Sequence, residues 1–432
     1  MTRDRIAAEL MQQIVADPDD DTPRLVMADW YDEQADPRGE LIRAQCELEH
    51  LDWLDPRFDE LEKVVEQLIS KHRAKWVKQL PKLPGITWGN FNVAFHEATW
   101  DGGRRFFRRG FIELVAIKDY KSHKKHVDAL RDYGLACYPE IVSCDHRCYR
   151  MLYDEPYVRG LGFYQQFSGI DFDQIATMTS RERLSSLAMV ECRLDKKEAE
   201  IFTSLDLPSL RMLDLHFNDL DDSIDTLCKW PAMKQLRGLN FGLNGLGDEN
   251  GKLSRLMSEP TLKQLSFLSL WGNRLTAQHL QTAADPCKID RLMHLDFSSN
   301  PFGDDGVIAL LEWPIESIRS LDLSHVAITG ASGQALANSR KLSNLRQLNI
   351  GHNSALDDAA AVAIAASESL ANLTHLNFAR TQFGETGAQA LIESTTLKSI
   401  RHLNIGDAEL EPKTLKMLQR RYPKAIKKDA HR

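Results

Sequence analysis

The sequence predicts an α/β solenoid, a horseshoe with a parallel sheet on its concave face and helices on its convex face, preceded by a small all-α module. The first observation is a pattern, Leu-x-x-Leu-x-Leu-x-x-Asn-x-Leu, that returns at intervals of 26 to 29 residues. Each copy is too short to bury a core alone, so neighbouring copies must stack. The second observation is that residues 1–80 carry apolar residues at helical spacing instead of this pattern.

The repeated pattern is clearest where it begins at Leu210, Leu236 and Leu265. Its spelling resembles the leucine-rich repeat, and the length of the copies resembles the ribonuclease-inhibitor type. The resemblance implies one strand per repeat with a helix behind it, supplied by segments such as residues 333–339 and 359–365. The central leucines of the successive strands are expected to be Leu187, Leu213, Leu239, Leu268, Leu295, Leu321, Leu348, Leu376 and Leu403.

The asparagine of the pattern follows each strand, where the chain bends out of the sheet. Its side chain can bond backbone groups at that bend. The expected ladder comprises Asn218, Asn244, Asn273, Asn300 and Asn353, with Cys192 in an earlier repeat. Val326, Thr381 and Ala408 depart from the pattern, so we expect looser turns or other partners there.

The N-terminal segment contains helices that start at Asp-rich, Pro-containing turns. The run Asp17-Pro-Asp-Asp-Asp-Thr-Pro-Arg-Leu-Val-Met-Ala-Asp-Trp-Tyr-Asp-Glu, followed by Asp36-Pro-Arg-Gly-Glu-Leu-Ile-Arg-Ala-Gln, resembles the bacterial "repeat-companion" domain. The later element Arg109-Gly-Phe-Ile-Glu113 resembles the junction that leads from that domain into its solenoid. The family implies no catalytic residue. We expect a helical core containing Leu25, Trp30, Leu41 and Leu48.

These patterns divide the chain into four parts. Residues 1–80 form the helical, repeat-companion-like module, and residues 81–157 form a junction with degenerate first repeats. The leucine-rich-repeat solenoid covers residues 158–410, and residues 411–432 form a capping helix with a basic tail. A polar terminal helix is expected because the last repeat otherwise exposes its apolar end.

Composition is that of a soluble globular protein, with a net charge of −8 and 43% hydrophobic residues. The first ten residues lack an apolar segment, and seven scattered cysteines do not suggest a disulfide framework, so we expect a cytoplasmic protein with no membrane span. Residues 1–60 carry 17 acidic against 6 basic side chains, whereas residues 71–160 carry 17 basic against 10 acidic ones. We expect this acidic head to form salt bridges with the basic neck.

Candidate binding residues cluster on the strands of the middle repeats. Side chains that alternate with the core leucines face the concave surface. The predicted concave strip comprises Met212, Asp214, His216, Phe267, Trp271, His294 and Asp296. Aromatic residues and methionine in one exposed strip are typical of an interface, with Trp271 as its anchor. The alternative is that Trp271 packs sideways over a neighbouring strand.

Other chemistry has weaker support. Cys137, Cys144, His146 and Cys148 are residue types that bind zinc, but their spacing is a poor match to known knuckles, and the sequence leaves metal binding there open. His96-Glu97 begins like a zinc-protease helix, but Trp100 replaces the second histidine. Arg104, Arg105, Arg108 and Arg109 interleave with phenylalanines, for which we favour salt bridges over nucleic-acid binding.

The sequence therefore predicts a non-enzymatic protein-interaction protein that binds a protein partner on the concave face, with no catalytic residue, cofactor or small-molecule substrate. One alternative is a regulator that blocks a basic enzyme in the manner of ribonuclease inhibitor. Another is an enzyme whose site lies in the N-terminal or neck segment, although no phosphate loop, dinucleotide motif or nucleophile elbow is present.

Overall fold

A computed structural model describes most of the 432-residue chain. The described residues are 3–17, 20–51, 56–88, 107–133, 138–141, 150, 152–155, 158–165, 169–248, 251–284, 291–406, 408–423 and 426–427. They divide into two compact units. Unit 1 contains residues 1–188 and 206–212, and unit 2 contains residues 189–205 and 213–432.

Unit 1 begins with four helices, which confirms the predicted all-α N-terminal module. They are α1 (Arg3–Ala16), α2 (Thr22–Glu33), α3 (Arg38–His50) and α4 (Pro56–Val77). The elements that follow are β1 (Ile86–Trp88), β2 (Leu114–Ile117), α5 (Tyr120–Tyr133), β3 (Tyr138–Ile141), β4 (Gly160–Tyr164) and α7 (Phe172–Thr177). Strand β2 pairs antiparallel with β1 and parallel with β3.

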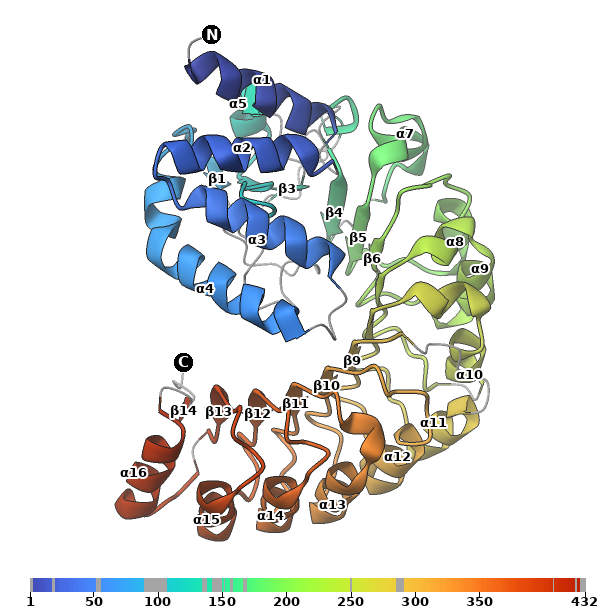
Figure 1. Ribbon diagram of the computed structural model, residues 1–432. Coiled ribbons are helices and arrows are strands. Elements are labelled where there is room, and N and C mark those ends of the chain that lie inside the picture. Colours follow the sequence, from blue (N-terminus) through green and yellow to red (C-terminus); the bar gives the residue numbers. More distant parts are fainter. Residues whose placement is uncertain are drawn as a thin grey trace. The chain divides into compact units, whose positions relative to one another are not determined.

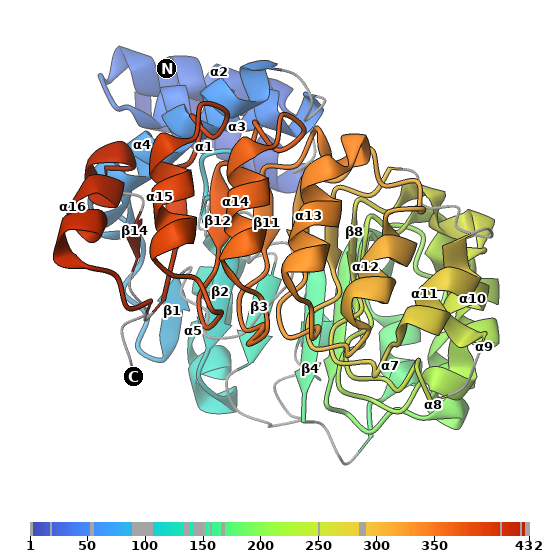
Figure 2. The ribbon, with the colours of Figure 1, turned by 90° about the horizontal axis from the view of Figure 1, so that it is seen from below.

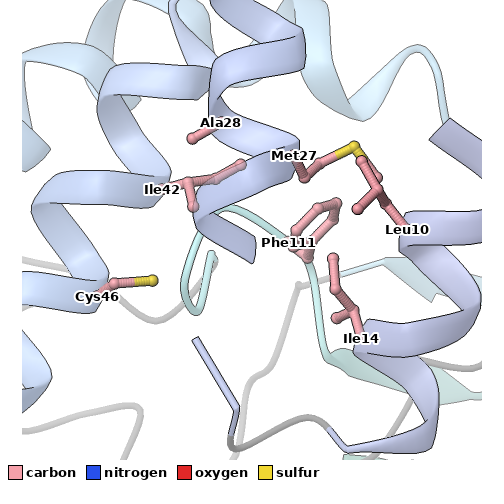
Figure 3. Packing of buried hydrophobic residues seen from close by; sticks show 7 residues of the cluster. All are labelled: Leu10, Ile14, Met27, Ala28, Ile42, Cys46 and Phe111. Carbon is pink, nitrogen blue, oxygen red and sulfur yellow. The ribbon is translucent and has the colours of Figure 1, made fainter. Parts of the chain in front are cut away.

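The core of the helical module includes a residue from far along the chain. Leu10, Ile14, Met27, Ala28, Ile42 and Cys46 enclose Phe111, as Figure 3 shows. Of the residues that we expected in this core, Leu41 is fully buried and Trp30 packs against the cluster. Leu48 is only half-buried, and Leu25 was wrongly predicted because it is 41% exposed. Helical spacing identified α2 but not the side of it that Phe111 would cover.

The segment Arg109-Gly-Phe-Ile-Glu113 contacts the N-terminal helices through ion pairs and close packing. Arg109 forms an ion pair of 3.0 Å with Asp21 before α2, and Glu113 forms a buried pair of 3.0 Å with Arg24 in α2. Gly110 has φ +88°, and a Cβ there would lie 2.1 Å from Ile42 Cγ1, so this close approach requires glycine. The expected salt bridges between acidic head and basic neck are thus present in unit 1.

Unit 2 is the solenoid, in which short strands alternate with helices. Strands β5 (Ser186–Val190) and β6 (Met212–Asp214) each cross the boundary between the units, and the others are β7 (Gly238–Asn240), β8 (Phe267–Ser269), β9 (His294–Asp296), β10 (Ser320–Asp322), β11 (Gln347–Asn349), β12 (His375–Asn377), β13 (His402–Asn404) and β14 (Ile426–Lys427). The helices are α8 (Lys196–Phe202), α9 (Ile224–Lys229), α10 (Lys252–Met257), α11 (Ala277–Ala284), α12 (Gly303–Leu310), α13 (Gly330–Asn338), α14 (Asp358–Ala366), α15 (Glu385–Glu393) and α16 (Pro412–Arg421).

The strands of unit 2 form one sheet in chain order, and every adjacent pair from β7 to β14 is parallel. The central leucines are in register, for example Leu268 with Leu295 and Leu321 with Leu348. Figures 1 and 2 show α11–α16 side by side on the outer face of these strands. The sheet therefore lines the inner face of unit 2, and the predicted α/β solenoid is confirmed.

The asparagines form the expected ladder from repeat to repeat. Asn273 Nδ2 donates to the carbonyls of Phe241 at 2.8 Å and Leu270 at 3.0 Å. Asn273 Oδ1 accepts from the backbone N–H groups of Asn244 and Leu246. Each amide thus satisfies buried backbone groups in its own repeat and the one before it. At Thr381, a departure from the pattern, the hydroxyl donates instead to the Phe378 carbonyl at 2.7 Å.

Candidate functional site

The structure divides the predicted concave strip into buried and accessible residues. Met212, Asp214 and Phe267 are buried, whereas His216, Trp271, His294 and Asp296 are partly exposed. Met212 belongs to unit 1, and the other six residues belong to unit 2. Alternation along a strand does not report how far neighbouring side chains cover a residue. Phe267, for example, lies beside the His294 ring at a centroid distance of 6.4 Å.

Trp271 lies two residues after the end of β8, and its indole lies over Gly242, at the equivalent position of the preceding repeat. A Cβ on Gly242 would lie 2.1 Å from the indole Nε1 and 2.2 Å from Cδ1. The glycine therefore makes the space that the indole occupies. This arrangement is the sideways packing named above as the alternative, yet the indole stays partly exposed. Trp271 is thus a fixed part of the surface instead of a mobile side chain.

His216 continues this surface one repeat further. Its ring lies 5.9 Å from the Trp271 ring, with the two planes inclined by 53°. His216 Nδ1 lies 2.8 Å from Asp214 Oδ1, and Asn240 Nδ2 lies 3.2 Å from the same nitrogen. A carboxylate only accepts hydrogen bonds, so Nδ1 donates to Asp214 in the tautomer that carries a proton there, and accepts from Asn240 in the other. The ring orientation of His216 is therefore set by a buried carboxylate.

The sequence analysis missed two apolar residues in these turns: the Phe217 N–H donates to the Gly242 carbonyl, and the Leu243 N–H donates to the Trp271 carbonyl, each at 2.9 Å. Leu243 lies against Gly272 of the next repeat, where a Cβ would come within 2.6 Å of Leu243 Cδ2. Phe217 is 48% exposed and has φ +60°. Among the large hydrophobic residues that are exposed in the described part of the chain, it is the aromatic one. We call Phe217, Leu243 and Trp271 the apolar patch.

The backbone at Phe217 explains why sequence reasoning overlooked it. The same turn position is left-handed in most repeats of unit 2, with φ values of +49° at Leu243, +57° at Ser299 and +57° at His352. A bulky side chain is disfavoured in this conformation. The pattern assigns this position to a turn, where an aromatic residue is not expected. An exposed phenylalanine at a strained turn was the available signal.

Further along the inner face, polar residues bond to one another across strands. Asp296 Oδ1 accepts from the Ser298 backbone and hydroxyl, and Asp296 Oδ2 accepts from Ser269 at 2.8 Å. Asp322 Oδ2 accepts from Asn349 Nδ2 at 2.7 Å. Burial raises the pKa of the Asp296 carboxyl, and the neighbouring charge of Asp322 adds to this increase. The carboxylates of Asp296 and Asp322 therefore link neighbouring strands of the sheet by hydrogen bonds.

Comparison with known proteins identifies the repeats. A family model described as "Leucine Rich repeat" matches residues 292–311, 341–365 and 369–391. These segments are leucine-rich repeats. They cover part of unit 2 only, and β8, which precedes Trp271, pairs in parallel register with β9 of the first matched segment.

Two solved structures are similar to this chain at low sequence identity. The crystal structure of an internalin (InlF) from Listeria monocytogenes is 16% identical, with a TM-score of 0.42, covering 73% of this chain and 78% of that chain. The crystal structure of a TLR13–ssRNA13 complex is 17% identical, with a TM-score of 0.37, covering 63% of this chain and 38% of that chain. A search of curated proteins gave no match.

Several candidates from the sequence lie outside the described residues. These are Cys137, Cys144, His146 and Cys148, together with His96, Trp100, Arg104 and Arg105. Within the described part of the chain, Arg108 pairs with Glu49 at 3.3 Å, as does Arg109. Among the helices described, none has the length and apolar character needed to cross a membrane.

Proposed function

We propose that this chain is a non-enzymatic protein-interaction protein, and that the apolar patch with His216 is the centre of its binding site. The observation that carries the proposal is Phe217, an exposed aromatic side chain in a left-handed turn whose backbone N–H donates to Gly242, the residue that the Trp271 indole covers. An exposed apolar side chain in a disfavoured conformation lowers the stability of the free protein. A partner that covers Phe217 would bury apolar surface that stays exposed to water in the free protein.

The rim of the patch supports recognition of a protein surface. Interface centres are enriched in aromatic residues and surrounded by polar groups that set orientation. Here His216 is oriented by Asp214, and His294 and Asp296 both lie on β9, the strand that pairs with β8. Phe267 is buried, and its ring packs beside the His294 ring. The partner would thus contact His216, Trp271, His294 and Asp296, with Asp214 and Phe267 behind them.

The titratable groups of this face favour binding over catalysis. The Asp214 and Asp296 carboxylates accept hydrogen bonds from His216 and from Ser298 and Ser269. A regulator of a basic enzyme would need concentrated, available negative charge, and these carboxylates are instead engaged in the sheet. We therefore prefer a general protein-binding role, in a soluble cytoplasmic protein, to the ribonuclease-inhibitor-like alternative.

A photo-crosslinking experiment with the full chain tests the proposal. A photoreactive residue at position 243 should trap a specific partner from native lysate, whereas the same residue at Val362, exposed on α14, should not. The purified partner is then titrated against wild-type and Trp271→Ala protein. We expect the substitution to weaken binding by on the order of 2 kcal/mol, about thirtyfold in Kd.

Melting curves separate a lost contact from a lost fold. Trp271→Ala leaves open space above Gly242 and should shift the melting transition little, because the indole is partly exposed. Gly242→Ala should displace the indole while retaining it, and should weaken binding as well. A partner that binds Trp271→Ala as tightly as the wild type would refute the proposed site.

A further inference from the structure

A histidine side chain takes part in capping α11, the helix that follows the turn of Trp271. Thr276 directly precedes this helix, and its backbone N–H donates to His279 Nδ1 at 3.1 Å. The Thr276 hydroxyl lies 2.8 Å from the same nitrogen, and the His279 N–H donates to the Thr276 carbonyl at 3.1 Å. Glutamate or glutamine is the usual residue at this third helical position, where its side chain accepts from the residue before the helix. A ring nitrogen performs this task in α11.

The cap requires one particular form of the His279 ring. A backbone N–H can only donate, so Nδ1 carries no proton while it accepts from Thr276. The neutral ring therefore has its proton on Nε2. Within the described residues Nε2 is buried without a hydrogen-bond partner, and the whole side chain is 6% exposed. The cap is thus formed by a neutral imidazole that is almost completely buried.

A positive charge on His279 would have no partner in the folded repeat. The helices α10 and α12 flank α11, and their charged residues are Lys252, Arg255, Asp304 and Asp305. Lys252 and Arg255 form ion pairs with acidic residues of the preceding repeat. Asp304 is bonded to Thr329 of the following repeat, and Asp305 is exposed. Burial lowers the pKa of the His279 ring, because a protonated ring would be a buried cation at the positive end of a helix.

We infer that α11 is a pH-sensitive helix, whose first turn opens when His279 takes up a proton. Protonation of Nδ1 places two N–H groups against each other, so the bond from the Thr276 backbone is lost. In the opened turn the charged ring reaches water, which solvates it. The proton therefore binds the opened turn more tightly than the closed one, and acidification shifts the equilibrium towards the opened form.

The turn that carries Trp271 is held separately from this cap. Asn300 Oδ1, in the next repeat, accepts from the backbone N–H groups of Asn273 and Leu275 at 2.9 Å. Neither bond involves a group that titrates near neutral pH. The opening therefore begins at Thr276 and leaves the turn of Trp271 in place, so the inference does not depend on the proposed binding site.

The pH range of the effect follows from the lowered pKa of His279. In the opened turn the ring has the ordinary pKa of a histidine, near 6.5, and well above that pH neither form is protonated. Below it the opened form takes up the proton first, so the ratio of opened to closed turns increases by up to about tenfold per pH unit. The increase ends once the pH falls below the lowered pKa of the closed form.

Hydrogen exchange of the full chain measures this opening. Protection factors of the α11 amides, corrected for the intrinsic pH dependence of exchange, report the ratio of closed to opened turns. In the wild type we expect protection to fall by about fivefold between about pH 6.5 and about pH 5.5. His279→Gln keeps an acceptor for the Thr276 N–H but cannot take up a proton, so its α11 protection should stay constant over this range.

Helix α13 is the internal reference, since the Thr329 hydroxyl caps it by accepting from the Ala331 N–H. Its protection should be independent of pH over the same range in both proteins. Nitrogen chemical shifts of the His279 ring near neutral pH should place the proton on Nε2. A proton on Nδ1, a wild-type α11 whose protection does not change with pH, or an equal loss of protection in His279→Gln would each overturn the inference.

Discussion

At the scale of single residues, function and folding compete at one turn position. Three residues after strands β6 to β12 the backbone is left-handed, and most of the residues at this position are polar or glycine: Phe217, Leu243, Gly272, Ser299, His325, His352 and Arg380. Phe217 and Leu243 depart from that preference. The Phe217 N–H donates to the carbonyl of Gly242, which Trp271 covers, and Leu243 lies against Gly272. The sequence pattern predicted the leucines and asparagines because each repeat needs them. It did not predict the apolar patch, because contacts between side chains of different repeats depend on the spacing of strands and not on periodicity.

The conflict at Phe217 gives a testable trade-off. Asparagine tolerates the left-handed conformation better than phenylalanine does, so Phe217→Asn should raise the free energy of unfolding by about 1 kcal/mol. The same substitution removes an exposed aromatic contact and should weaken binding of the crosslinked partner. Denaturant titration and partner titration measure the two effects.

Ser299→Asn is the matched control at the same turn position, in the repeat that follows Trp271. It should leave partner binding unchanged. If Phe217→Asn behaves in the same way, Phe217 is a neutral surface residue and the centre of the site is elsewhere.

At the scale of elements, acidic residues join consecutive helices of the solenoid. Asp304 connects α12 to the start of α13, and Glu385 in α15 accepts from the Thr414 hydroxyl of α16 at 2.6 Å. Burial by itself raises the pKa of the Asp304 carboxyl, but the hydrogen bonds from Ser332 and Thr329 together outweigh burial and hold that pKa below its ordinary value. The sequence predicted helices on the outer side of the sheet but not these links, because their partners lie 25 or more residues apart.

The lowered pKa of Asp304 predicts a pH-dependent contribution to stability. An acid whose pKa is lower in the folded chain stabilises it above the unfolded pKa, near 4, and this contribution is lost as pH falls through the folded pKa. Asp304→Asn should therefore cost about 1–2 kcal/mol near neutral pH and progressively less below about pH 4. Asp305→Asn, at a neighbouring residue, should cost little throughout. A penalty for Asp304→Asn that stays constant from neutral to acidic pH would show that shape, and not charge, is what the helices need.

At the scale of the whole molecule, each repeat of unit 2 is stabilised by its neighbours. Leu268 is fully buried and lies in register with Leu239 and Leu295. Length, periodicity and apolar spacing therefore predicted the solenoid correctly. They did not predict that Phe111 completes the core of the helical module, because no periodic pattern links residues so far apart in sequence.

Removing one central leucine tests the dependence of a repeat on its neighbours. Leu268→Ala should lower the free energy of unfolding by about 2–5 kcal/mol, as for other buried leucines. Hydrogen exchange should then increase at β7 and β9 as well as at β8, since stability in a solenoid is shared between adjacent repeats. Val362→Ala, at an exposed residue of α14, should change stability by about 0.5 kcal/mol or less. An increase in exchange confined to β8 would contradict this shared stability.

The backbone bonds made just before each strand, such as those that the Arg319 carbonyl accepts from Arg346 and Gln347, have a consequence for how such a chain evolves. A serine, methionine, threonine or arginine at that position supports the next repeat equally well through its carbonyl. Point mutations there can therefore rewrite the pattern of surface charge one strand at a time while the scaffold is inherited unchanged.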